Sequence, residues 1–235
     1  MVKEELIRRS PLRILERSIH GGVGAGNIGV VAAPRGTGKT ACLVHIGTDH
    51  LLENRHVIHV SFADRVDHIV SWYEGIFGEV AARFRLDDPM AVHDEAVRNR
   101  VIMNFSGEAA RIGHVEERIE EVCSTGGFEA DTMLVDGYDP RGASDEEIAR
   151  LKEFAAKIGL EVWFSVDINR RGPDTDPRAV PPELETLVDH VAVLIVMDPS
   201  PEGVRLHLIK DRDSPVAPDM HLLLDPMNLL IVKEG

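Results

Sequence analysis

The residues with the clearest capacity for chemistry lie between Ala33 and Thr40, in the sequence APRGTGKT. The spacing A-x-x-x-x-G-K-T is that of a phosphate-binding loop, with Ala33 in place of the usual first glycine. In such a loop, backbone N–H groups surround the phosphates, the lysine neutralises the terminal oxygens and the hydroxyl group ligates Mg²⁺. Lys39 and Thr40 are therefore predicted to hold a nucleoside triphosphate; the alternative is a glycine-rich turn that binds nothing. The expected contact residues are Pro34, Arg35, Gly36, Thr37, Gly38, Lys39, Thr40 and Ala41.

A magnesium-dependent site of this kind also needs an acidic residue at the end of a neighbouring buried strand. Asp136 ends the apolar segment TMLVD, and it is the predicted partner of Thr40 in holding Mg²⁺. Asp139, in DGYDP, is interpreted as a turn former, a role that aspartate fills often.

The segments around these residues alternate between strand and helix patterns. Ile28 to Ala33 is a continuous apolar run, typical of a buried parallel strand, and a helix-length segment follows Thr40. Ser144 and Glu147 predict a capping box at a helix start, and Gly159 predicts the helix end. Further strands are expected at 56–62, 101–105, 132–136 and 161–166, and further helices at 64–84 and 114–124. This order predicts an α/β fold with a mainly parallel sheet and helices on both faces.

After residue 188 the pattern changes to VAVLIVM, VRLHLIK, MHLLL and NLLIV, joined by short turns. These segments predict antiparallel hairpin strands at one end of the sheet. We expect a single domain over 21–235, preceded by an N-terminal leader at 1–20. The Pro- and Asp-rich segment 167–182 is interpreted as a functional or mobile loop.

Composition limits the possible functions. The chain has 26 Lys and Arg against 40 Asp and Glu, a net charge of −14, which argues against a surface that coats nucleic acid or anionic membrane. No apolar run approaches the roughly 18 to 20 residues that span a bilayer, and the first 20 residues lack the apolar core of a signal peptide. The only cysteines, Cys42 and Cys123, lie far apart, as is usual in a reducing compartment. We therefore expect a cytoplasmic protein.

The motifs, taken in order, resemble the RecA-like ATPases, closest to the KaiC and RadA branch. The resemblance covers about residues 20–232 and is carried by GGVGAGNIGVVAAPRGTGKT, HVIHVSFAD, TMLVDGYD, VDHVAVLIV and LHLIKDRD. It implies a RecA-like P-loop NTPase fold, ATP and Mg²⁺ as ligands, hydrolysis to ADP and phosphate, and a homo-oligomer, with a hexamer as one form.

The resemblance also assigns roles, and in one place the chain departs from it. The family has a catalytic glutamate after the strand equivalent to HVIHVSF, where this chain has Ala63, and alanine cannot accept a proton. Asp64 is the expected substitute base, and its alternative role is an N-cap for the helix that follows. Lys210 and Arg212 look like the family's K-x-R pair, which reaches the γ-phosphate of the neighbouring subunit. Ser165 and Asp167 lie where the family senses the γ-phosphate; simple strand termination is the alternative.

Other residues carry weaker signals. Four histidines lack a metal-ligand pattern and are interpreted as helix-surface and strand residues: His45, His50, His56 and His59. An aromatic stripe at helical spacing is interpreted as core: Trp72, Tyr73 and Phe77. Basic residues in the long loop could contact a nucleotide, nucleic acid or a partner: Arg170, Arg171 and Arg178.

The leading functional hypothesis is an oligomeric RecA-like protein that hydrolyses ATP slowly and uses the cycle to change conformation or partner affinity. An alternative keeps ATP and Mg²⁺ but has lost turnover, with Ala63 as its signature. A DNA recombination or repair ATPase is a further alternative, disfavoured by the net charge of −14. A small-molecule kinase is disfavoured by the antiparallel C-terminal strands and the KDRD segment.

Overall fold

A nine-stranded sheet forms the centre of the molecule, with the strand order β3-β2-β4-β5-β1-β6-β7-β8-β9. The computed structural model describes residues 1–62, 65–106, 112–169, 172, 175–216 and 219–234. The strands are β1 Ile28–Ala33, β2 Val57–Ser61, β3 Arg100–Asn104, β4 Thr132–Asp136, β5 Glu161–Asp167, β6 Val193–Ser200, β7 Gly203–Asp211, β8 Leu222–Leu224 and β9 Ile231–Lys233. The pairings from β3 to β6 are parallel and those from β6 to β9 are antiparallel, as the sequence predicts.

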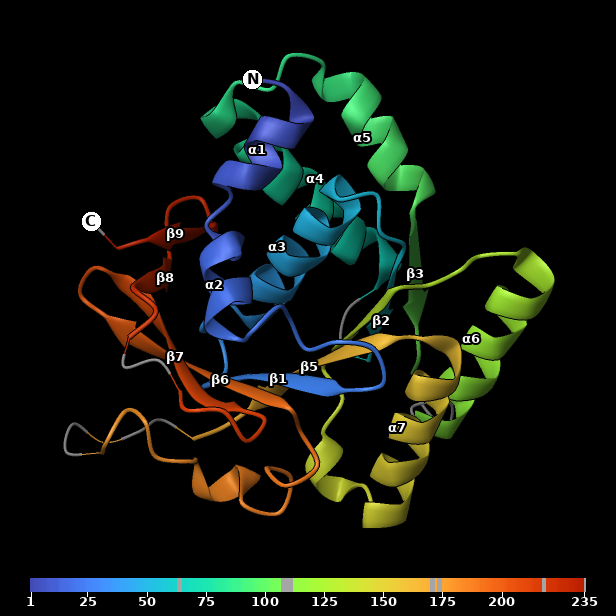
Figure 1. Cartoon of the computed structure of the whole chain (residues 1–235), viewed down its shortest axis with the longest axis vertical. Coiled ribbons are helices and arrows are strands. Elements are labelled where there is room, and N and C mark those ends of the chain that lie inside the picture. The colour runs from blue at the N-terminus through green and yellow to red at the C-terminus, as the bar shows by residue number, and fades with distance from the viewer. Residues whose placement is uncertain (63–64, 107–111, 170–171, 173–174, 217–218, 235) are drawn as a thin grey trace.

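Helices cover both faces of this sheet (Figure 1). They are α1 Lys3–Arg9, α2 Leu12–Ser18, α3 Lys39–Leu52, α4 Val66–Phe84, α5 Pro89–Arg98, α6 Ile112–Gly126 and α7 Asp145–Ile158. Leu43 of α3 and Tyr73 of α4 belong to the apolar core on one face, whereas Ile119 of α6 and Leu151 of α7 belong to the core on the other. The central strands are buried on both faces, which explains why β1 and β4 read as continuous apolar runs.

The local signals of α7 are confirmed. The Ser144 Oγ accepts a hydrogen bond from the backbone N–H of Glu147 at 3.3 Å, and Glu147 accepts one from the backbone of Ser144 at 2.9 Å. Gly159 ends the helix with φ +74°, in the left-handed region that glycine adopts without strain. These contacts join residues close in sequence, so the sequence alone could predict them.

Three features differ from the sequence expectations. Helix α5 was not predicted, although Asp88 caps it through the Ala91 N–H and Pro89 occupies its first position. Strand β6 is antiparallel to β7 but parallel to β1, so it is part of the parallel sheet and of the hairpin series. The leader at 1–20 forms α1 and α2, and its Leu6 and Leu15 are buried in the same core as α3.

Candidate functional site

The predicted phosphate-binding loop connects β1 to α3. Gly36 has φ +79° and Gly38 has φ +101°, conformations that L side chains rarely adopt. A Cβ atom on Gly38 would also lie 2.6 Å from Leu224 Cδ2, so a larger residue would require the Leu224 side chain to move as well. Ala33 is the last residue of β1 and has strand geometry, so the motif's first glycine is not needed for the conformation seen here.

Thr40 and Asp136 meet at the carboxyl ends of the strands, as the sequence predicts. The Thr40 hydroxyl donates to Asp136 Oδ2 at 2.7 Å, across 96 residues of sequence. The Ser165 hydroxyl donates to the other carboxylate oxygen, Oδ1, and accepts a hydrogen bond from the Gly137 N–H at 3.1 Å. Asp136 is buried, and these two hydroxyl groups fix the direction of its carboxylate.

Lys39 points into the same region. Its ammonium group donates to the backbone oxygens of Ala33 and Pro34, each at 3.2 Å, and pairs with Asp167 Oδ1 at 2.6 Å. Arg35 lies 3.6 Å from the other Asp167 oxygen, with its own side chain 94% exposed. Asp167 therefore interacts with two cations of the loop, and an anion of higher charge could take over those interactions.

These residues line an open cleft with a volume of about 830 Å³. The lining residues are Arg35, Gly36, Gly38, Lys39, Thr40, Ala41, Trp72, Asp136, Gly137, Tyr138, Asp139, Arg141, Ser165, Asp167 and Leu229. We call this cavity, together with its lining residues, the cleft. Such a position, outside the carboxyl ends of parallel strands, is where open α/β sheets bind ligands.

Sequence reasoning missed part of the cleft wall. Tyr138, Arg141 and Leu229 line it without having been predicted, and Trp72 was assigned to the core but is only partly buried and lines the cleft. Asp139 does form a turn, as predicted, by capping the short 3-10 helix Pro140–Gly142. In the sequence, Arg141 could have been found only from its position two residues after Asp139, which places both residues in the same turn.

The predicted trans-acting pair is engaged within its own chain. The Lys210 ammonium donates to the backbone oxygen of Val188 at 2.6 Å. Arg212, just after β7, donates to the backbone oxygens of Ile19 at 3.3 Å, Gly22 at 2.7 Å and Val23 at 2.6 Å. We call Arg212 and these three carbonyl groups the Arg212 contact. It ties the end of β7 to the segment that precedes β1.

Ala63 and Asp64 lie outside the described residues, and so do Arg170 and Arg171. The neighbouring backbone is described up to Phe62, whose N–H donates to the backbone oxygen of Asp136 at 2.8 Å. Phe62, the last described residue before this gap, therefore lies next to Asp136. Arg178 is exposed, and its N–H donates to Asp176 Oδ1 at 2.9 Å.

The helix histidines are buried, so their assignment to the helix surface was wrong. His45 Nδ1 accepts the backbone N–H of Ile231 at 2.8 Å, and burial lowers the pKa of His45 to about 3. Burial likewise lowers the pKa of His50 to about 4, against a smaller opposing effect of Glu161. The reason is that α3 is packed on all sides, between the sheet and the helices α1, α4 and α5.

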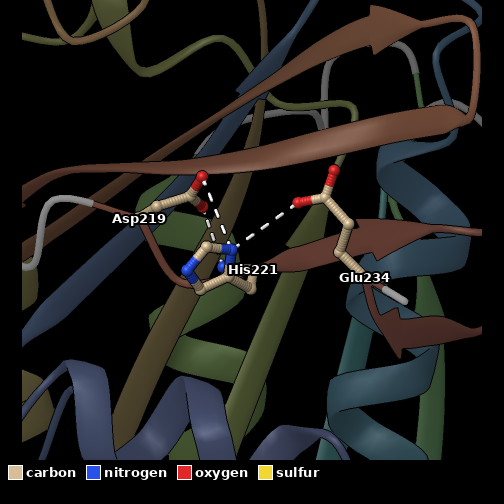
Figure 2. A group of neighbouring side chains, drawn as sticks. All are labelled: Asp219, His221 and Glu234. Carbon is tan, nitrogen blue, oxygen red and sulfur yellow. Dashed lines mark hydrogen bonds and ion pairs between the residues drawn. The ribbon is translucent and has the colours of Figure 1, made fainter.

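Two further groups of acidic residues lie away from the cleft. Figure 2 shows the His221 ring between Asp219 and Glu234, with His221 Nδ1 3.8 Å and 3.7 Å from their carboxylate oxygens. Glu234 also pairs with Arg205. In the second group, Glu16, Asp49 and Glu53 surround the guanidinium of one residue, Arg13. Each group thus has an arginine partner, Arg205 for Glu234 and Arg13 for the second group.

In comparisons with known proteins, no family model matches this chain, and none of the curated proteins is similar to it in sequence. Among the described residues, no helix is both long and apolar enough to cross a membrane.

Proposed function

We propose that this protein is a RecA-like P-loop protein that binds ATP with Mg²⁺ and acts as a slow ATPase in a homo-oligomer. One observation carries the proposal: a strand-loop-helix with Lys39 in the cleft and a hydrogen bond between Thr40 and the strand-terminal Asp136. The site thus combines, in one cleft, a lysine for the phosphates with the hydroxyl and carboxylate oxygens that would hold Mg²⁺. The parallel strands and the antiparallel C-terminal strands also agree with what the RecA resemblance implies.

The residues of the cleft fit a triphosphate and a magnesium ion. The loop N–H groups and the N-terminus of α3 favour an anion, and Lys39 supplies a positive charge next to them. Oxygen ligands such as those of Thr40 and Asp136 are the ones that Mg²⁺ prefers. A bound Mg²⁺ would supply positive charge to offset the negative charge of the phosphates. Lys39 can exchange Asp167 for phosphate oxygens, because both are charged acceptors of the same ammonium group.

Two observations favour a second candidate, an ATP-binding protein without turnover. The residue at the family's catalytic glutamate position is Ala63, which offers no base. The resemblance implies that Arg212 contacts the γ-phosphate bound by a neighbouring subunit. Here Arg212 donates instead to three carbonyl groups of its own chain. Release of [γ-³²P]phosphate from ATP, measured with wild type and Asp64→Asn, separates the two candidates. The ATPase requires slow release that Asp64→Asn abolishes, whereas the binding protein releases none.

Nucleotide binding itself is tested by Lys39→Ala. A ligand at a hundred times its Kd stabilises the folded state by about 2.7 kcal/mol, which for a chain of this size raises Tm by roughly 5 to 10 °C. We expect Mg·ATP to produce such a shift in wild type and none in Lys39→Ala, measured by scanning calorimetry.

The matched control is Lys157→Ala, which removes an exposed lysine of α7 that pairs with Glu120 outside the cleft. It should retain the full shift. A wild type whose Tm does not respond to millimolar Mg·ATP would disprove the proposed function.

A further inference from the structure

A second arginine lies in the cleft, in the same chain as the phosphate-binding loop. Arg141 is held by Asp139 through a bidentate pair, with Nε to Oδ1 at 2.7 Å and Nη2 to Oδ2 at 2.8 Å. Its backbone N–H also donates to Asp139 Oδ1, at 3.0 Å, because Asp139 caps the turn that carries it. The guanidinium is therefore fixed in direction before any ligand binds. Preorganised charge of this kind costs little ordering on binding.

The charge of Arg141 acts on the same part of the cleft as that of Lys39. The hydrogen bonds that Arg141 donates to the Asp139 carboxylate raise the pKa of Arg141, and the nearby negative charges of Glu183 and Asp167 add to this effect. Asp167 is the residue that pairs with Lys39 at 2.6 Å and with Arg35 at 3.6 Å. Arg141 lines the same cleft as Lys39, Arg35 and Asp167. A multiply charged anion that displaces Asp167 from Lys39 would therefore meet three basic side chains.

Arg141 and Arg35 differ in how well they could select such an anion. The Arg35 side chain is 94% exposed and has only a loose pair with Asp167. The Arg141 side chain is 29% exposed and anchored, with Nη1 outside its pair with Asp139. An anchored group discriminates between ligands better than a mobile, solvated one, because it cannot follow a ligand of a different length.

We propose that Arg141, oriented by Asp139, binds the terminal phosphate of a nucleoside triphosphate held by its own subunit, and thereby distinguishes ATP from ADP. This inference rests on the proposed function. It assigns in cis the γ-phosphate contact that the sequence resemblance gives to Arg212 of a neighbouring subunit. Arg141 is the binding residue, and Asp139 is a positioning residue that acts through it.

The test compares the affinities for a non-hydrolysable ATP analogue, AMP-PNP, and for ADP, both with Mg²⁺, by isothermal titration calorimetry. Arg141→Ala should weaken AMP-PNP binding by at least about tenfold, as expected for one lost charge-assisted hydrogen bond. ADP binding should change by less than about twofold, because ADP lacks the phosphate that Arg141 contacts. The ratio of the two affinities should not depend on protein concentration, since no second subunit takes part.

Three further variants complete the test. Arg141→Lys should keep more of the ATP preference than Arg141→Ala does, because lysine keeps the positive charge but lacks the paired N–H donors of the guanidinium group. Asp139→Asn keeps a side-chain acceptor for the turn but not the bidentate pair, so it should lower the preference less than Arg141→Ala does. Arg150→Ala removes an arginine that pairs with Glu116 on α6, outside the cleft, and should leave both affinities unchanged. Far-UV circular dichroism of each ligand-free variant verifies folding.

The outcomes separate this inference from the proposed function. If Arg141→Ala and Arg141→Lys bind AMP-PNP and ADP in the wild-type ratio, Arg141 does not contact the terminal phosphate, and nucleotide binding still stands. If wild type binds neither nucleotide, both the proposed function and this inference are wrong. A preference for AMP-PNP that rises with protein concentration would overturn the cis assignment in favour of a contact between subunits.

Discussion

Arg141 and Arg212 carry the same guanidinium group, but their acceptors lie in different parts of the molecule. Arg141 pairs with the carboxylate of Asp139 at the edge of an open cleft. Arg212 donates to three backbone oxygens and to the buried carboxylate of Asp211, and it joins β7 to the segment before β1. The first arrangement places a guanidinium group and its carboxylate in the lining of the cleft, whereas the second uses the donors to hold the chain together. A basic residue in a sequence motif can therefore serve the ligand or the fold, and its acceptors decide which.

The largest expected effect on stability is that of Arg212→Ala. Hydrogen bonds from a charged donor contribute about 1.5 to 3 kcal/mol each and do not add fully, so we expect a loss of roughly 3 kcal/mol. Arg141→Ala removes an exposed pair and should cost less than about 1 kcal/mol. Urea unfolding of the two ligand-free variants measures this difference. Equal losses of stability in the two variants would mean that Arg141 supports the fold as much as Arg212 does.

The next largest expected effect is a loss of folding stability at acidic pH, caused by the buried His45. The pKa of His45 is lowered to about 3 in the folded state, while an unfolded histidine titrates near 6.5. Below pH 6.5 the unfolded state thus binds more protons, so stability falls with decreasing pH, by about 1.4 kcal/mol for each unit, until the pH nears the folded pKa. Between pH 6.5 and 5, this amounts to about 2 kcal/mol for His45.

Chemical unfolding as a function of pH checks this assignment. His45→Gln should flatten the dependence between pH 6.5 and 5, and His68→Gln, on the exposed face of α4, is the control. His50, with its pKa lowered to about 4, contributes in the same direction. An unchanged slope in His45→Gln would mean that other groups cause the acid sensitivity.

Asp136→Asn tests the proposed magnesium site of the cleft, and its expected effect is smaller than the two above. The substitution keeps the shape of the side chain but removes the charge that would attract Mg²⁺, so we expect Mg·ATP affinity to fall about tenfold, or about 1.4 kcal/mol. ATP affinity in the presence of EDTA should change much less. Calorimetric titrations with and without Mg²⁺ give both values. Asp94→Asn is the matched control, because it removes an exposed carboxylate of α5 that lies outside the cleft.

The smallest expected effect is that of His20→Ala at the border of the Arg212 contact. His20 contacts the buried carboxylate of Asp211, but its own side chain is 59% exposed. Asp211 also keeps Arg212 Nη1 as a donor, at 3.1 Å. We therefore expect a loss below about 1 kcal/mol, measured by thermal unfolding. A loss as large as that of Arg212→Ala would show that Asp211, rather than the carbonyl groups, anchors this region.

The sequence by itself determined the features that arise from neighbouring residues. The loop glycines at 36 and 38, the capping box of Ser144 and the strand–helix alternation depend on backbone preferences over a few positions, so their pattern is visible in the chain. Asp136 was predictable because parallel strands end at one edge of the sheet. A strand-terminal acid therefore meets the loop after β1 when β4 and β1 lie close in that sheet.

Only the tertiary structure decided which side chains share a surface over long sequence separations. The partners of Arg212 lie about 190 residues away, and the burial of His45 results from packing against elements at both ends of the chain. Trp72 has the spacing of a core residue, yet it lines the cleft, because helix periodicity gives the face of a residue but not what lies opposite that face. Such contacts depend on how whole elements pack, and no local preference encodes them.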